Sequence, residues 1–287
     1  MSGSPEVVDY GRFADRLAAA RAAAAADPAR RWDLYHEFHA EWGSVAVESE
    51  PKTHEPYILD LIGTKAPGDP EADPEADPGI PEALAEWWIL PAGADYDHGD
   101  WPPTWRPDPT GYGVSEGLAE ESPFAIPGKD LRMACFLAEA QYCNEWAYLS
   151  AESHLPDPKV LVSVGPEWEE QAPSVSQFFL HLATRSLLPE YAWTAEPDDW
   201  DETDGLAERV RAVLPELGLR PWRELGSWSV LHGGPDVIVD VDVDGAGNTD
   251  YPLRVFGRTR EAVENLLERL GGEWQVAEPE QTAERDR

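Results

Sequence analysis

From residue 237 to residue 243 a valine stands at every second position. The side chains of these valines would share one face of an extended strand, because successive side chains in a strand point to opposite faces. The valines are Val237, Val239, Val241 and Val243. Asp244-Gly245 follows and favours a tight hairpin turn. Such a strand needs a neighbouring strand and a cover on its valine face, so the segment predicts an antiparallel sheet with one buried face.

Other segments predict helices between the strands. Ser174 and Gln177 form a capping box ahead of a helix that we expect to stop at Pro189, and Asp27-Pro28 marks the start of another helix. The predicted helices are 5–26, 28–42, one that begins at Pro81, 174–189, 205–215 and 259–270. The predicted strands are 131–136, 145–149, 159–164, 227–232, 236–244 and 251–257. We therefore predict an α+β fold, a mainly antiparallel sheet flanked by helices.

A short acidic repeat divides the chain. Residues 69–78 read Asp-Pro-Glu-Ala-Asp-Pro-Glu-Ala-Asp-Pro, and each proline disfavours helix at the residue before it. We expect an N-terminal helical extension over 1–65, an acidic Pro-rich linker over 66–79 and the main domain over 80–275. A disordered tail is expected over 276–287.

The charge of the chain limits its partners. Its 22 Lys and Arg against 56 Asp and Glu give a net charge of −34, which would repel a nucleic-acid backbone. Hydrophobic residues at 42% and 13 tryptophans predict a packed core. The most apolar stretch, 178–188, is too short to span a membrane, and no signal peptide is visible. We expect a cytoplasmic protein whose two cysteines, Cys135 and Cys143, are reduced and structural.

Two motifs resemble catalytic or metal sites, but each lacks a feature that such a site needs. Gly113-Val-Ser115-Glu-Gly117 matches a nucleophile elbow, but the Pro-rich segment before it cannot be a central strand. His36 and His39 are spaced i,i+3, whereas a zinc helix needs a histidine at position 40, which is alanine. We interpret the first match as chance and His39 as a hydrogen-bonded core residue.

A third motif resembles a calcium loop. Asp240, Asp242, Asp244 and Gly245 spell its opening, but its twelfth position is Tyr251 instead of glutamate, and the preceding residues alternate as a strand. The simplest interpretation is that these aspartates form the solvent face of the hairpin, with a weak cation site as the alternative. We therefore expect no catalytic residue, no metal ligand and no cofactor.

The clearest candidate for function is a docking surface for protein. Trp200 lies among carboxylates, an aromatic anchor with a charged rim of the kind that a basic partner would bind. The candidate partner-binding residues are Trp101, Trp105, Asp198, Asp199, Trp200 and Asp201. Prolines would hold the loop of Trp101 and Trp105 extended. The competing interpretation is that each of these indoles packs back onto the body of the protein.

Four segments of the main body carry a family resemblance. They are Ile80-Pro-Glu-Ala-Leu-Ala-Glu-Trp-Trp, Leu131-Arg-Met-Ala-Cys-Phe-Leu-Ala-Glu-Ala-Gln-Tyr-Cys-Asn-Glu-Trp, Leu155-Pro-Asp-Pro-Lys-Val-Leu-Val-Ser-Val and Ala172-Pro-Ser-Val-Ser-Gln-Phe-Phe-Leu. In this order they resemble the SUKH superfamily, which includes bacterial immunity proteins and fungal cell-wall-synthesis regulators. Gly233-Gly-Pro-Asp-Val and Phe256-Gly-Arg-Thr-Arg-Glu-Ala also resemble the end of long bacterial members, so the resemblance spans 80–275.

The resemblance implies an α+β domain without catalytic residues that binds and neutralises a toxin, often a nuclease. The charge of the chain agrees, because a nuclease must be basic to hold phosphate and an acidic partner would be steered towards it. We therefore expect a non-enzymatic immunity protein. The alternatives are a regulatory or scaffold protein that binds a housekeeping partner, and a hydrolase that uses Ser115 or carboxylates.

Overall fold

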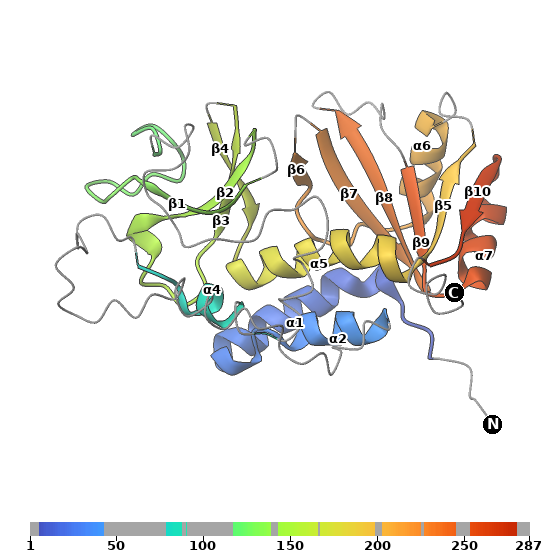
Figure 1. Cartoon of the computed structure of the whole chain (residues 1–287), viewed down its shortest axis with the longest axis horizontal. Helices are drawn as coiled ribbons and strands as arrows, with labels where there is room; N and C mark the ends of the chain where they lie inside the picture. Colours follow the sequence, from blue (N-terminus) through green and yellow to red (C-terminus); the bar gives the residue numbers. More distant parts are fainter. Residues whose placement is uncertain are drawn as a thin grey trace, which may run out of the picture. The chain divides into compact units, whose positions relative to one another are not determined.

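Antiparallel sheets and helices make up the described part of the chain, which confirms the expected α+β class (Figure 1). The computed structural model describes residues 6–42, 79–87, 90, 117–138, 143–165, 167–198, 203–224, 227–244 and 253–279. Met1–Val45 and Leu180–Arg287 form one unit, and Ala46–Phe179 forms the other. The boundary between the two units falls within a single helix, α5.

The helices keep most of the expected positions. They are α1 (Phe13–Ala26), α2 (Asp33–Glu41), α4 (Glu82–Trp87), α5 (Val175–Tyr191), α6 (Thr203–Val213) and α7 (Arg260–Leu270), with the short 3-10 helices η1 (Tyr10–Arg12), η2 (Pro28–Arg30) and η4 (Ser150–Glu152). The expected caps are present, since the side chains of Asp27 and Ser174 accept the backbone N–H of Ala29 and Gln177. The α5 helix passes Pro189 and ends at Tyr191, because a proline so near the end removes only one of the last hydrogen bonds.

Four strands of the first sheet follow one another in the chain. They are β1 (Met133–Ala138), β2 (Glu145–Leu149), β3 (Val160–Val164) and β4 (Glu167–Ala172), paired in this order. All residues of β1 and β2 are buried. On one face Met133 and Cys135 pack against Leu118 and Trp168. Elsewhere Phe136 packs against Phe178 and Phe179, so β1 contributes to two apolar cores.

The second sheet has six strands in the order β10-β5-β9-β8-β7-β6. The strands are β5 (Trp193–Pro197), β6 (Trp222–Glu224), β7 (Ser227–Gly234), β8 (Val237–Asp244), β9 (Leu253–Gly257) and β10 (Trp274–Ala277). The four alternating valines of β8 lie in one apolar cluster with Leu206 and Val210 of α6 and with Val263 and Leu266 of α7. The predicted valine face is therefore the buried face. Strands β4, β5, β6 and β10 were not predicted.

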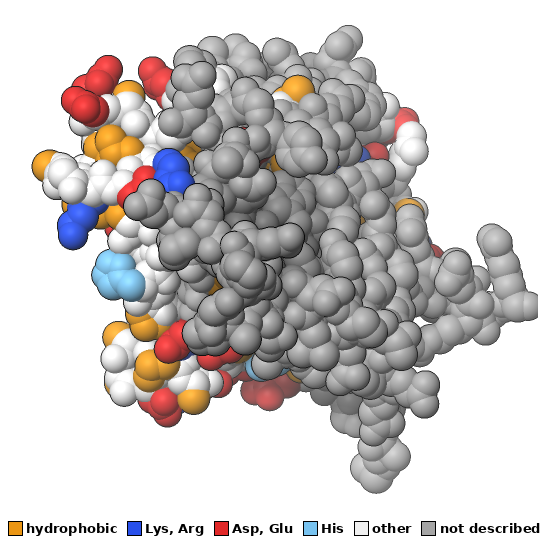
Figure 2. Space-filling view, turned by 60° about the vertical axis from the view of Figure 1, so that its left-hand side comes forward, with side chains coloured by type: hydrophobic (Ala, Val, Ile, Leu, Met, Phe, Trp, Pro, Cys, Tyr) orange, Lys and Arg blue, Asp and Glu red, His pale blue; other side chains and the backbone are white. Residues whose placement is uncertain are grey.

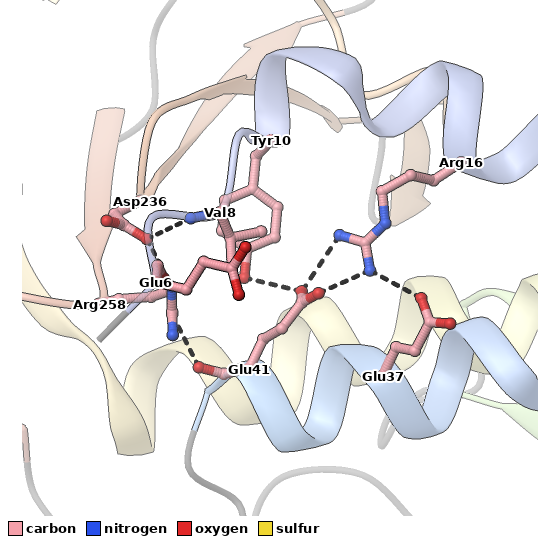
Figure 3. Close-up of polar contacts among 8 residues, drawn as sticks. All are labelled: Glu6, Val8, Tyr10, Arg16, Glu37, Glu41, Asp236 and Arg258. Atoms are coloured by element: carbon pink, nitrogen blue, oxygen red, sulfur yellow. Dashed lines mark hydrogen bonds and ion pairs between the residues drawn. The ribbon is translucent and has the colours of Figure 1, made fainter. Parts of the chain in front are cut away.

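The N-terminal helices belong to the unit that contains the six-stranded sheet, and a polar network joins them to the β7–β8 turn (Figure 3). The Asp236 carboxylate accepts hydrogen bonds from the Val8 N–H at 2.9 Å and from Arg258 Nη1 at 2.6 Å. Arg258 also donates to the backbone carbonyls of Glu6 and Glu41. The expected division into a separate extension and one domain over 80–275 differs from this arrangement, because these contacts are non-local and leave no periodic pattern in the sequence.

One glycine explains how the N-terminal segment approaches the sheet so closely. A Cβ atom at Gly233 would lie 2.4 Å from the carbonyl oxygen of Tyr10, so a larger residue would displace the segment. The Tyr10 ring stacks on Trp42 with centroids 5.6 Å apart, and its hydroxyl donates to Glu41 at 3.1 Å. Arg16 pairs with Glu41 at 2.6 Å, which ties α1 to α2. Aromatic packing and hydrogen bonds thus hold this segment together.

Candidate functional site

The six-stranded sheet carries a row of polar side chains on the face opposite the valines. Residues paired across antiparallel strands project to the same face, and the pairs are Gln275 with Glu196, Asp240 with Arg254, Asp242 with Ser229, and Ser229 with Trp222. We call this face of the sheet the charged face. It comprises Trp222, Glu224, Ser229, Asp240, Asp242, Arg254, Glu196 and Gln275, together with His181 and Arg185 of α5, which pack on it. Trp222, Ser229 and His181 are buried in it, whereas Arg254 and Glu196 are about half exposed.

Arg185 is the central cation of the charged face. Its Nη1 atom lies 3.7 Å from Asp240 Oδ2, and its Nη2 atom lies 3.9 Å from Glu224 Oε2. Its guanidinium carbon lies 5.5 Å from the centre of the Trp222 ring, within range of a cation–π interaction. Within the described structure the buried Nε and Nη1 atoms have no hydrogen-bond partner. Arg185 is thus held by charge and by the ring, at distances longer than hydrogen bonds.

The neighbours of Arg185 complete this arrangement. Ser229 donates a short hydrogen bond to Asp240, and the indole Nε1 of Trp222 donates to Glu224 at 3.3 Å. His181, one helical turn before Arg185, packs edge-on against Trp222 with centroids 5.0 Å apart. Burial, aided by the charge of Arg185, lowers the pKa of His181 to about 3, so its imidazole is neutral at physiological pH.

Asp242 differs from the other carboxylates of the charged face. Burial, reinforced by the neighbouring Asp240, raises the pKa of Asp242 to about 7, against the opposing effects of Arg185 and Arg254. The sequence predicted that these aspartates form the solvent face of a hairpin. They do lie opposite the valines, but Asp240 and Asp242 are partly buried, because α5 brings Arg185 onto the sheet.

The expected docking residues fall mostly outside the described part of the chain. The residues outside the described part are Trp101, Trp105, Asp199, Trp200 and Asp201, and also Ser115. Asp198 is described, is exposed, and accepts a hydrogen bond from Gln275 Nε2 at 2.5 Å. The acidic run that begins at Asp198 therefore starts beside β10, the outermost strand of the charged face. On that strand Val276 is 39% exposed.

The paired histidines of α2 and the two cysteines differ in burial. His39 is buried against Tyr35 with ring centroids 4.4 Å apart, and burial lowers its pKa to about 4, whereas His36 is exposed. Cys135 is buried and Cys143 is exposed. In the ranges that the structure describes, no group of three or more His, Cys, Asp or Glu side chains could hold a metal ion. Nor does any described helix have the length and apolar run of a membrane span.

Sequence reasoning missed a buried carboxyl group in the four-stranded sheet. Glu145 of β2 accepts a hydrogen bond from the Cys135 thiol at 3.7 Å, and its Oε1 atom has no hydrogen-bond partner in the described structure. Burial raises the pKa of Glu145 and favours its neutral form. Its side chain is almost fully buried, so it is less accessible than the carboxylates of the charged face.

Comparison of the chain with protein-family models, with curated proteins and with solved structures gave no match.

Proposed function

We propose that this chain is a non-enzymatic protein-binding module, and that its partner is a basic protein. The observation that carries this proposal is the charged face, where four carboxylates and two arginines lie on strands and a helix of one folded unit. Side chains fixed on regular elements lose little freedom when a partner binds. A surplus of negative charge on such a surface favours a positively charged partner.

The charge and surface composition support the same function. The net charge of −34 would steer a basic partner to the protein and raise its association rate at low salt. Asp and Glu side chains lie beside hydrophobic side chains in several places on the face drawn in Figure 2. Asp198 also links the charged face to the acidic run that contains Trp200.

We further propose that the module is an immunity protein of the SUKH type, which neutralises a toxin. The support is the resemblance in sequence. The four resembling segments contain the helix α4, the strand β1, the strand β3 and the start of the helix α5. A nuclease toxin, which must be basic to bind phosphate, would fit the acidic surface.

The test begins with the partner itself. The tagged full-length chain is cross-linked in its source cell, and the captured protein is identified, purified and titrated calorimetrically. We expect a basic protein whose own activity is inhibited at a one-to-one ratio and whose affinity falls as salt rises. An acidic partner or a salt-independent affinity would contradict the proposal. A basic housekeeping protein without toxicity would favour the regulatory alternative over immunity.

Variants of the acidic run sharpen the test. We expect Trp200→Ala to weaken binding by at least about 2 kcal/mol while thermal stability stays nearly unchanged. Val213→Ala, an exposed apolar position on α6, is the matched control and should leave the affinity unchanged. The hydrolase alternative is tested separately. An esterase activity of the purified chain that Ser115→Ala removes would overturn the non-enzymatic function.

A further inference from the structure

The carboxylates of the charged face are unequally paired with cations. Glu196 pairs with Arg254 at 2.8 Å, and Arg185 lies between Asp240 and Glu224 at 3.7 and 3.9 Å. Among the described residues, the carboxylate of Asp242 has neither a hydrogen bond nor an ion pair. One half-buried carboxylate of the row therefore lacks a partner that its neighbours have.

The chain's own cations near Asp242 are already engaged. Arg185 of α5 is held between Asp240 and Glu224 and lies over the Trp222 ring, while Arg254 of β9 pairs with Glu196. Ser229 of β7, directly opposite Asp242, donates its hydroxyl proton to Asp240 instead. The nearby groups therefore attract Asp242 only through space, and Asp240 and Glu224 repel its charged form.

Further polar atoms of this cluster are unsatisfied. His181 is 2% exposed, and neither its Nε2 atom nor the Nε and Nη1 atoms of Arg185 have a hydrogen-bond partner in the described structure. The Arg185 atoms are donors that a second cation cannot satisfy, so it is the open carboxylate of Asp242 that points to a cationic group. Because His181 stays neutral, it cannot provide the missing positive charge.

We propose that Asp242 receives one arginine or lysine side chain of the protein partner. The inference rests on the proposed function and names the chemistry of contact at one residue. Asp242 is only partly buried, and the neighbouring Arg254 and Glu196 side chains are 48 and 45% exposed. A cationic side chain can therefore approach from that side, and a charged hydrogen bond there is stronger than one in open solvent.

Docking of a cation at Asp242 makes binding depend on pH. The cation requires the ionised carboxylate, whereas the unbound protein holds a proton on Asp242 up to a pH of about 7. The proton is therefore expelled on binding below that pH, and the affinity rises with pH until Asp242 is fully ionised. We expect affinity about tenfold weaker at pH 6 than at pH 8, from the change in the ionised fraction.

The test uses an end-blocked Gly-Arg-Gly peptide as the probe and the full chain with ¹³C-labelled aspartate. Carboxyl NMR titration of Asp242 is expected to move by about half a pH unit or more to lower pH when the peptide is present at about 50 mM. The isosteric citrulline peptide and sodium chloride of equal ionic strength should not move it. If the titration midpoint of Asp242 is the same with and without the arginine peptide, the proposal is overturned.

Variants separate this inference from the proposed function. With the purified partner, Asp242→Asn should weaken binding and abolish its pH dependence, while Glu261→Gln, an exposed change on α7, should do neither. If a basic partner binds and Asp242→Asn does not change its affinity, the cation contact at Asp242 is wrong but the proposed function is supported. If the peptide shifts the titration of Asp242 but no protein partner binds, the proposed function is wrong but the cation contact is supported.

Discussion

Strands β1 and β2 bury all of their residues, whereas β8 buries its valines and keeps Asp240 and Asp242 on its other face. Aromatic and aliphatic side chains account for most of the interior around the four-stranded sheet. The six-stranded sheet has an apolar face against α6 and α7 and the charged face opposite. The chain itself fills both faces of β1 and β2, whereas α5 covers only part of the charged face and leaves Arg254 and Glu196 about half exposed.

The four-stranded sheet should tolerate core truncation poorly. Phe136 of β1 is fully buried against the rings of Tyr148, Phe178 and Phe179. We expect Phe136→Ala to lower the free energy of unfolding by about 3–5 kcal/mol, because it removes a buried ring and leaves a cavity. Urea unfolding followed by circular dichroism measures the loss. Leu155→Ala, at an exposed position in the same unit, is the control and should cost under about 0.5 kcal/mol.

A polar junction joins the six-stranded sheet to the N-terminal segment. Arg258→Ala should cost about 3 kcal/mol, because it leaves the largely buried Asp236 carboxylate without its counter-cation and removes bonds to two backbone carbonyls. Hydrogen exchange should rise over residues 6–12 before it rises in β8. Exposed Arg260→Ala is the control, since its pair with Glu264 lies in solvent. Equal exchange in both variants would show that Arg258 does not anchor the N-terminal segment.

The charged face should make the free energy of unfolding depend on pH. Because the pKa of Asp242 is about 7 in the folded chain and about 3.9 in an unfolded one, the folded state holds an extra proton between these values. Its stabilising effect is complete below pH 4 and is lost as the pH rises through 7. From pH 4 to pH 8, wild-type stability should therefore fall relative to Asp242→Asn by on the order of 3–4 kcal/mol.

The quantity to measure is the difference in unfolding free energy between the wild-type chain and Asp242→Asn. His39 and His181, whose pKa values are lowered by burial, make stability rise with pH between about 4 and 6.5, but they act equally in both proteins. Chemical unfolding at several pH values gives both stability curves. Parallel curves would mean that Asp242 titrates normally and would remove the basis for proton-linked docking.

Local patterns predicted the elements that carry their own signals. The alternation of β8, the capping box of α5 and the leucine spacing of α7 are each visible within a dozen residues. Strands β4, β6 and β10 were missed because they are edge strands, which pairing with a neighbour keeps extended, and β6 and β10 are also short. Their polar residues, as in Glu167–Ala172, give no alternation to detect.

The charged face could be predicted only in part. The sequence places Asp240 and Asp242 opposite the valines, since strand geometry fixes that relation. It does not reveal that Arg185, more than fifty positions earlier, lies over them, nor that Glu224 faces the same guanidinium. These contacts depend on how α5 and β6 pack on the sheet. The unusual pKa of Asp242 follows from that packing and was therefore invisible in the sequence.

The last prediction concerns calcium, for which the expected effect is zero. In the suggested loop, oxygen atoms from alternating aspartates would surround one ion at about 2.3–2.6 Å. In β8, residues two apart are separated by about 6.6 Å along the strand, and Asp240 is already hydrogen-bonded to Ser229 and near Arg185.

A site with a Kd of about 0.1 mM would add about 2.7 kcal/mol to the free energy of unfolding at 10 mM calcium. We expect no rise in Tm beyond that given by sodium chloride of equal ionic strength. A rise that Asp242→Asn abolishes would mean that the charged face binds a metal ion, and the cation assigned to Asp242 would then need to be chosen again.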